Sequence, residues 1–308
     1  MKPRRALTHP VIGPYAAAPL YFAWRWVFRY KPWLSDRKAI TSRYRKIFGV
    51  TPDLDNPRGF NEKIQWLKLN DRDPMKVTCS DKIMVRDYIT DTVGERYTIP
   101  LLGIYTSPDA ITPEILPDAP FVIKTNHDQG TVFPVLDKTT ADFEHIRGYL
   151  RLALRRNLYH VMREWPYDRI NPRRILVEPH LKPDDPESIK DYKVYCFNGE
   201  PGLIFVVSNR SRDDRRNFYT STWDSVDVEA GYPQGDVEPP PERLDEMLHV
   251  ARRLSERFHF VRVDFFIVDG KPKVGEMTFF PVGGFIHFEP RDFDITMGNM
   301  LELPDTTR

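Results

Sequence analysis

The chain has 308 residues, of which 41% are hydrophobic, enough for one large domain or two to three smaller lobes with a substantial core. Its net charge of +1 excludes a protein that binds nucleic acid through overall positive charge. The charge is uneven, because residues 1–50 contain eleven lysine and arginine residues and a single acid, Asp36.

Residues 1–58 form a basic, aromatic extension that we expect to be helical. The apolar run from Val11 to Phe28 is interrupted by glycine, two prolines and Arg25, which is a poor pattern for a transmembrane helix. Residues 11–34 mix aromatic and basic side chains. This composition is typical of peripheral membrane contact, but also of a basic helix that packs on the catalytic body or binds an acidic polymer.

No cleavable signal peptide is evident in the sequence. We therefore expect a cytoplasmic protein, held at the inner face of the cell membrane if residues 11–34 make that contact. Cys79 and Cys196 lie far apart and show no CxxC or zinc spacing. The pair predicts free thiols in a reducing compartment.

The hydrophobic pattern predicts helices and strands in a mixed order. Two early helices are expected at 57–68, with Asn61 as a cap, and at 80–92, capped by Ser80 or Asp81. A short strand at 98–104 precedes a strand–loop–strand unit at 121–136. The remaining expected elements are a helix at 142–161, a strand at 174–178, a hairpin at 191–207 around Asn198-Gly199, a helix at 244–258 and a hairpin at 261–279. This order favours α+β lobes around a central cleft.

The hairpin at 261–279 carries polar groups in otherwise apolar strands. Because side chains alternate along a strand, Arg262 and Asp264 share one face, and Glu276 and Thr278 share one face of the return strand. Two opposed carboxylates beside an arginine suit Mg²⁺ and a polyphosphate. Asp264 lies opposite Glu276 only if the loop has three residues or the strand contains a bulge. The alternative is a hairpin with solvated charges.

Four other residues are candidates for contact with a nucleotide. Lys124 ends an apolar strand before a loop and is suited to phosphate, or it is a strand-end lysine in solvent. Lys82 has the same two alternatives on a helix surface. Glu178 closes a strand and can accept from a ribose or adenine donor, or it is an edge-strand acid. Lys193 shares a face with Tyr195 and Phe197, so a buried position would require an anion.

Familiar catalytic motifs are absent from the sequence. It contains no HExxH, GxSxG, Walker A or GxGxxG pattern. Serine hydrolases, P-loop NTPases and dinucleotide-binding dehydrogenases are therefore disfavoured.

From about residue 40 to the C-terminus, the chain resembles the ATP-grasp superfamily, and within it the branch similar to the teichuronopeptide biosynthesis protein, termed TupA-like. The resemblance is carried by the order of eight stretches: FNEKIQWLK (60–68), DKIMVRDY (81–88), IPLLG (99–103), FVIKTNH (121–127), REWPY (163–167), DYKVYCFNGEP (191–201), FVRVD (260–264) and GEMTFFP (275–281). It implies an ATP-grasp fold in which two α+β lobes hold ATP. The implied division is the extension at 1–58, an N-terminal portion at 59–118, a small nucleotide-binding lobe at 119–180 and a catalytic lobe with a metal site at 181–308.

The resemblance also implies an activity and its residues. The activity is an ATP- and Mg²⁺-dependent carboxylate–amine ligase that acts through an acyl phosphate and releases ADP. Its cofactors are ATP and Mg²⁺, and its substrates are a carboxylate and an amine, or an acidic glycan acceptor of cell-surface polysaccharide assembly. The implied ATP-binding residues are Lys82, Lys124, Glu178 and Lys193, the implied metal ligands are Asp264, Glu276 and Thr278, and Arg262 is the implied catalytic residue.

Two departures from the branch, and two alternatives, accompany this hypothesis. The loop after Lys124 keeps only Gly130 and contains Asp128, an acid that is unfavourable beside phosphates. Thr278 stands where the wider superfamily often has an asparagine. The alternative functions are a glycosyltransferase of surface polysaccharide synthesis and a non-catalytic ATP-binding scaffold.

Overall fold

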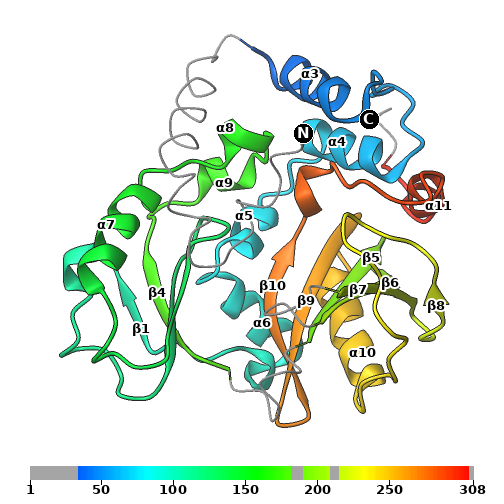
Figure 1. Ribbon diagram of the computed structural model, residues 1–308. Helices are drawn as coiled ribbons and strands as arrows, with labels where there is room; N and C mark the ends of the chain where they lie inside the picture. The colour runs from blue at the N-terminus through cyan, green and yellow to red at the C-terminus, as the bar shows by residue number, and fades with distance from the viewer. Residues whose placement is uncertain (1–33, 182–189, 209–214, 305–308) are drawn as a thin grey trace, which may run out of the picture.

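The computed structural model describes residues 34–181, 190–208 and 215–304 of the chain. This part contains two antiparallel sheets, a small one in the order β1-β4-β2-β3 and a large one in the order β10-β9-β5-β6-β7-β8. Figure 1 shows the small sheet on the left and the large sheet on the right, with α5 and α6 between them. The content is α+β, as expected.

The elements follow one another in a mixed order. The described helices are α3 (Asp36–Phe48), α4 (Phe60–Asn70), α5 (Met75–Ser80), α6 (Val85–Val93), α7 (Phe143–Ala153), α8 (Tyr159–Met162), α9 (Pro166–Arg169), α10 (Leu244–Ser255) and α11 (Phe293–Asn299), with 3₁₀ turns at Glu95–Tyr97, Pro108–Ala110 and Pro281–Gly283. The described strands are β1 (Gly103–Tyr105), β2 (Phe121–Thr125), β3 (Val132–Val135), β4 (Ile175–Pro179), β5 (Asp191–Phe197), β6 (Glu200–Ser208), β7 (Arg215–Thr220), β8 (Ser225–Val226), β9 (Phe260–Val268) and β10 (Lys271–Thr278).

Some helix and strand bounds differ from the expectation. The helix expected at 142–161 stops at Ala153, and α8 follows as a separate turn. The helix expected at 80–92 begins only at Val85, as α6. The separate helix α5 ends at Ser80, and the side chain of Asp81 accepts from Ile83 N between the two helices. The strand expected at 98–104 begins only at Gly103.

One face of the small sheet forms its own core with α7. This core contains Phe121, Ile123, Phe143, Ile146, Leu150, Ile175 and Val177. Because side chains alternate along a strand, Lys124 and Glu178 lie on the opposite face of the sheet, away from α7. The fold therefore turns these two candidates away from the small lobe's core.

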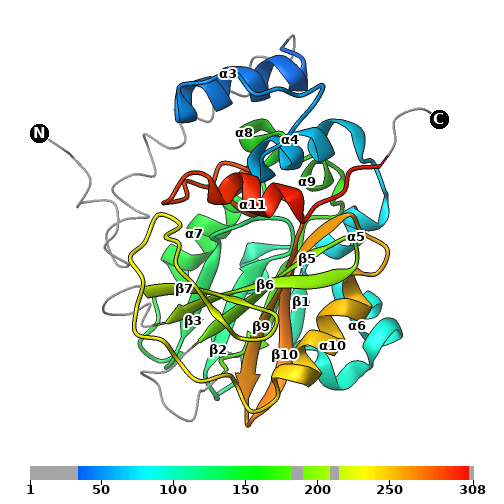
Figure 2. The same ribbon diagram turned by 90° about the vertical axis from the view of Figure 1, so that its right-hand side faces the viewer.

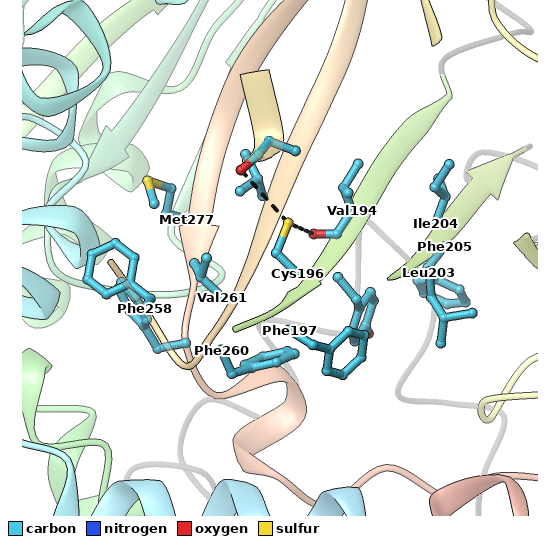
Figure 3. Packing of buried hydrophobic residues seen from close by; sticks show 14 of the residues in the cluster. Val194, Cys196, Phe197, Leu203, Ile204, Phe205, Phe258, Phe260, Val261 and Met277 are labelled. Carbon is cyan, nitrogen blue, oxygen red and sulfur yellow. Dashed lines mark hydrogen bonds between the residues drawn. The ribbon is translucent and has the colours of Figure 1, made fainter. Parts of the chain in front are cut away.

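The large sheet packs its apolar face on α10. Val261, Val263 and Phe265 of β9 are fully buried there, as the alternation of the sequence predicts. Figure 3 shows this packing around Cys196, whose thiol donates to Val194 O and to Ala251 O of α10. The other face of the same strands carries Lys193, Arg262 and Asp264.

α3 is the described part of the N-terminal extension. Ser35 caps it, and its buried Ile40 and Tyr44 face the body of the protein, where Tyr44 contacts Phe285 with 6.2 Å between ring centroids. Figure 2 shows α3 lying above α4 and α11. Residues 11–33, which contain nearly all of the predicted membrane-contact segment, lie outside the described residues. Within the described ranges, no helix combines the length and apolar character that a bilayer crossing requires.

Candidate active site

Lys124 and Glu178 form an ion pair on the open face of the small sheet. Lys124 Nζ lies 2.5 Å from Glu178 Oε2, and Arg86 of α6 donates to the other oxygen of the same carboxylate. Glu178 is 4% exposed, so its charge is compensated by two cations rather than by water. The structure thus brings together two of the predicted nucleotide residues and adds Arg86, which sequence reasoning missed.

A bulge at Gly275 aligns the two acids of the 261–279 hairpin. Lys271 pairs with Val268, so the loop has two residues and not three. The register shifts by one residue between Val274 and Glu276, and this shift makes Glu276 the direct partner of Asp264. A bulge in β10, the second of the two conditions given above, therefore places Glu276 opposite Asp264.

Asp264 is the centre of a buried charge network. Its Oδ1 accepts from Arg262 Nε at 2.6 Å, and its Oδ2 accepts from Arg262 Nη2 at 2.7 Å and from Lys193 Nζ at 2.6 Å. Lys193 also donates to Asp191 at 2.7 Å. Burial alone would raise the pKa of Asp264, but Arg262 and Lys193 outweigh burial and lower that pKa below its usual value. Asp264 is therefore ionised at neutral pH.

Lys82 connects this face to the loop after β2. Its Nζ donates to Asp128 O at 2.8 Å and lies 3.9 Å from Glu276 Oε1. Its backbone N donates to Asn126 O at 3.0 Å. One turn further along the chain, Arg86 reaches Glu178, so one short segment contacts candidate residues of both sheets.

Asp128 does not face this cluster with its carboxylate. The side chain is buried, and its Oδ2 accepts from Thr131 Oγ1 at 2.9 Å and from Arg156 Nη1 at 3.3 Å. The negative charge of Asp128 is therefore balanced by Arg156 within the small lobe. Its partner Arg156 follows α7, and nothing local in the sequence indicates the pairing.

A polar stripe on α4 holds the segment that follows β10. Asn61, Gln65 and Lys68 repeat at helical spacing and are all buried. Asn61 exchanges two hydrogen bonds with the backbone of Ile286, and Lys68 Nζ donates to Gly283 O at 2.5 Å. Asn61 is thus not the expected helix cap, since Gly59 holds that position.

The stripe supports an unusual backbone turn. Val282, Gly283 and Gly284 have φ values of 52°, 64° and 67°, a run in the left-handed region that a β-branched residue seldom adopts. Gln65 Nε2 donates to Gly283 O at 2.9 Å and to Gly284 O at 2.7 Å. Strained turns of this kind persist where surrounding contacts fix them.

Glu164 and Tyr167, from the REWPY stretch, lie near the same cluster. Burial raises the pKa of Glu164 to about 7, with Lys68 opposing the shift and Glu276 adding to it. Burial also raises the pKa of Tyr167, and the charges of Glu276 and Glu164 add to that effect. Tyr167 Oη accepts from Gln129 Nε2 at 2.9 Å. Glu164 and Tyr167 belong to a stretch that carries the family resemblance, but the sequence analysis assigned no function to either residue.

The donor set at Asp264 and Glu276 fits Mg²⁺ if a ligand completes the coordination. Mg²⁺ commonly takes one or two carboxylates and fills its other positions with phosphate oxygens and water. Glu276 has a 31% exposed side chain, whereas Thr278 Oγ1 accepts from Arg262 Nη2 at 3.2 Å. Across residues 34–181, 190–208 and 215–304, no cluster of three or more His, Cys, Asp and Glu side chains has metal-site geometry.

Two cavities of the described chain lie beside α3. One has a volume of about 280 Å³ between α3, α8 and Phe285, and the other has a volume of about 230 Å³ beside α4 and α11. Lys82, Lys124, Glu178 and Lys193 line neither of them. The candidate site is therefore defined by its contacts and charges and not by either cavity.

Comparison with protein families gives a match over most of the chain. Residues 62–302 match the profile described as TupA-like ATP-grasp. Among curated proteins, none matches the chain significantly.

Solved structures with partial likeness include three ligases or synthetases. D-alanine–D-alanine ligase from Bacillus anthracis, complexed with ATP, is 16% identical over 65% of this chain and 53% of its own, with a TM-score of 0.37. The Helicobacter pylori D-Ala–D-Ala ligase is 13% identical over 79% and 69%, with a TM-score of 0.39. N5-carboxyaminoimidazole synthetase from Staphylococcus aureus, complexed with ADP, is 12% identical over 73% and 52%, with a TM-score of 0.37. The chain thus spans little more than half of the first and third of these proteins.

Proposed function

The chain belongs to the TupA-like ATP-grasp family, and from this premise we propose that it is an ATP- and Mg²⁺-dependent ligase that joins a carboxylate to an amine. ATP is proposed to lie between the two sheets, with Lys124 and Lys193 on either side. Lys82 supplies a further positive charge between them. Glu178 is proposed to receive the ribose or the base.

One observation supports this proposal above the others. Lys193, Arg262 and Asp264 lie side by side on neighbouring strands, and the bulge at Gly275 adds Glu276 to the same face. Cations and carboxylates in a buried position are costly unless a charged ligand or a partner balances them. A row of this kind on a strand face suits a triphosphate with its divalent ion.

The proposed reaction has two steps. An oxygen of the substrate carboxylate forms a bond to the γ-phosphorus of ATP, and the bond from that phosphorus to the ADP oxygen breaks. The nitrogen of the amine then bonds to the acyl carbon, the carbon–oxygen bond to phosphate breaks, and an amine proton leaves. The products are an amide, ADP and inorganic phosphate.

Arg262 is proposed to steady the negative charge of the acyl phosphate and of the tetrahedral oxyanion. Its guanidinium is already oriented by both oxygens of Asp264, so it needs little reorganisation on binding. Lys193 and Lys82 are proposed to hold the phosphates in line for attack.

Mg²⁺, when bound, supplies charge neutralisation at the phosphate oxygens. Asp264 and Glu276 would hold it. Thr278 is proposed as an oxygen neighbour whose hydroxyl also accepts from Arg262. Binding of Mg²⁺ by Asp264 would compete with the hydrogen bond that Asp264 accepts from Lys193. The ammonium group of Lys193 would then be available to a phosphate.

The biological setting is proposed to be cell-surface polysaccharide or teichuronopeptide-type assembly. The carboxylate would then be an amino acid or a uronic acid of an acidic glycan. The basic excess of residues 1–50 is consistent with an acceptor that is polyanionic or held at the membrane, and residues 11–34 are proposed as the contact.

The test is an ADP-release screen in Mg²⁺ over pairs of amino acids and uronates. We expect ADP and phosphate in equal amounts, formed only when both a carboxylate and an amine are present. Asp264→Asn should reduce this rate by at least about a hundredfold, as the loss of a group that stabilises a transition state does. Asp245→Asn, on the exposed side of α10, is the matched control.

Other results would contradict the proposal. AMP as the product would indicate adenylation. Stabilisation by UDP-sugars but not by ATP would favour the glycosyltransferase, and tight ATP binding without turnover for any pair would favour the non-catalytic scaffold.

A further inference from the structure

The loop between β2 and β3 is held in place by its own side chains rather than by glycines. Asn126 begins it, and its Nδ2 donates to Asp81 Oδ2 at 2.8 Å while its Oδ1 accepts from Arg174 N at 2.8 Å. The loop therefore starts from a buried amide that ties it to two other segments. A glycine-rich loop has no such attachment.

The next two side chains point toward α7. His127 is fully buried, and its Nε2 lies 3.2 Å from Ala153 O. Burial lowers the pKa of His127 to about 4, so the ring is neutral and its N–H donates to that carbonyl. Asp128 follows, with its ion pair to Arg156 and its bond from Thr131.

Arg156 is itself fixed from several sides. Its guanidinium lies 4.5 Å from the centroid of the Tyr149 ring, and its Nη1 donates to Tyr149 Oη at 3.1 Å. Asp128 Oδ1 accepts no hydrogen bond within the described part of the chain. The charge of the buried Asp128 carboxylate thus depends on Arg156.

The opposite side of the loop contacts the candidate site. The carbonyl of Asp128 accepts from Lys82, and Gln129 donates to Tyr167. Lys82 in turn lies 3.9 Å from Glu276. The loop therefore connects a buried anchor on α7 to the residues that are proposed to hold the phosphates.

We propose that Asp128 and Arg156 are positioning residues for the nucleotide phosphates, because their buried ion pair fixes the 126–131 loop against Lys82. The proposal rests on the proposed function, which places ATP at this loop. It also explains how a loop with one glycine holds its position, since the ordering that a nucleotide would otherwise impose is already present.

The sign of one substitution separates this role from the simpler alternative. If the Asp128 carboxylate faced the phosphates, Asp128→Asn would remove a repulsion and tighten nucleotide binding. If the carboxylate anchors the loop, the same change weakens the bond to Arg156 and loosens the loop. Arg156→Met is more severe, because it leaves a buried carboxylate without its counterion.

The experiment is calorimetric titration of ADP, and of a non-hydrolysable ATP analogue, into the full chain in Mg²⁺. We expect Asp128→Asn to weaken the affinity about tenfold, equivalent to about 1.4 kcal/mol. Arg156→Met should weaken it further, and Arg156→Lys should restore part of the loss. The control is Asp109→Asn, which removes the exposed ion pair of Asp109 with Arg151 of α7 and should leave the affinity unchanged.

Melting temperature and amide exchange of residues 126–131 accompany each titration. For Asp128→Asn, a positioning role predicts faster exchange in this loop with little change in melting temperature. Should Asp128→Asn fail to fold, Thr131→Val removes one bond to the same carboxylate and should weaken binding in the same direction.

Two results would overturn the inference. Unchanged or tighter nucleotide binding by Asp128→Asn, beside a wild-type chain that binds normally, removes the positioning role and leaves the proposed ligase standing. A wild-type chain that binds neither nucleotide removes both proposals together.

Discussion

Glu276 lies directly across from Asp264 because one extra residue, Gly275, interrupts the ladder between β9 and β10. In a regular ladder without the bulge, Asp264 would pair with Gly275, and the side chain of Glu276 would lie on the face of the sheet that packs on α10. A Cβ at position 275 would lie 2.7 Å from the Phe266 ring. Glycine is therefore required by space at the residue that sets the register.

Gly275→Ala should destabilise the chain and lower ADP formation together. The added methyl must displace the ring of Phe266, and overpacking of this kind costs about 1–3 kcal/mol. Urea unfolding and the ADP-release assay are the measurements. The control is Gly148→Ala in α7. A Cβ added there would meet no atom of another element within 4 Å, so this change should stabilise the chain slightly. Normal activity of the Gly275→Ala variant would contradict the role of the bulge.

Asp264→Asn should reduce the dependence of stability on acidic pH. The folded pKa of Asp264 lies below its unfolded value of about 3.9, so its contribution is present above that value and is lost as pH falls through the folded pKa. The difference between the unfolding free energies at pH 5 and at pH 3 should therefore be smaller for the variant than for the wild type. Equal losses in the two chains would show that Arg262 and Lys193 do not depress this pKa.

Lys68→Met should be more damaging than the double change Lys68→Met with Glu164→Gln. The single change removes the donor to Gly283 O and Met162 O, and it also removes the positive charge that opposes the rise in the pKa of the buried Glu164. The double change removes both buried charges. The measurement is the melting temperature of each variant. Equal melting temperatures would exclude a coupling between Lys68 and Glu164.

Cys79 and Cys196 should both resist thiol reagents in the folded chain. Both are free and buried, and burial raises the pKa of Cys196 to about 12 and raises the pKa of Cys79 as well. Because the thiolate is the reactive form, Ellman's reagent should react only as the chain unfolds. Rapid labelling of either thiol under native conditions would contradict this packing.

Local features of the fold could be predicted from the sequence, whereas partners distant in the chain could not. The Asn198-Gly199 hairpin was predicted from turn chemistry and is confirmed, with φ values of 50° and 88°. The burial of Val261 and Val263 follows from strand alternation. The partner of Asp128, Arg156, is 28 residues further along the chain and could not be foreseen, and Asn61 was taken for a cap because its partner, Ile286, is 225 residues away.

The candidate site divides in the same way. The pairing of Asp264 with Glu276 was a conditional prediction, and the bulge that meets the condition depends on Phe266, a neighbour on the opposing strand. Lys193 in a buried anionic setting is also found. The roles assigned to the individual site residues stay predictions. They are ATP binding by Lys82, Lys124, Glu178 and Lys193, metal binding by Asp264, Glu276 and Thr278, and catalysis by Arg262.

The stripe on α4 has a consequence for synthesis on the ribosome. Asn61, Gln65 and Lys68 are translated early, yet Lys68 finds Gly283 only 215 residues later. Until residues 283–286 leave the ribosome, the polar side chains of α4 that this segment buries lack their hydrogen-bond partners. The packing of α4 must therefore wait until residues 283–286 have been synthesised, and a nascent chain halted before Pro281 would leave α4 exposed to chaperones.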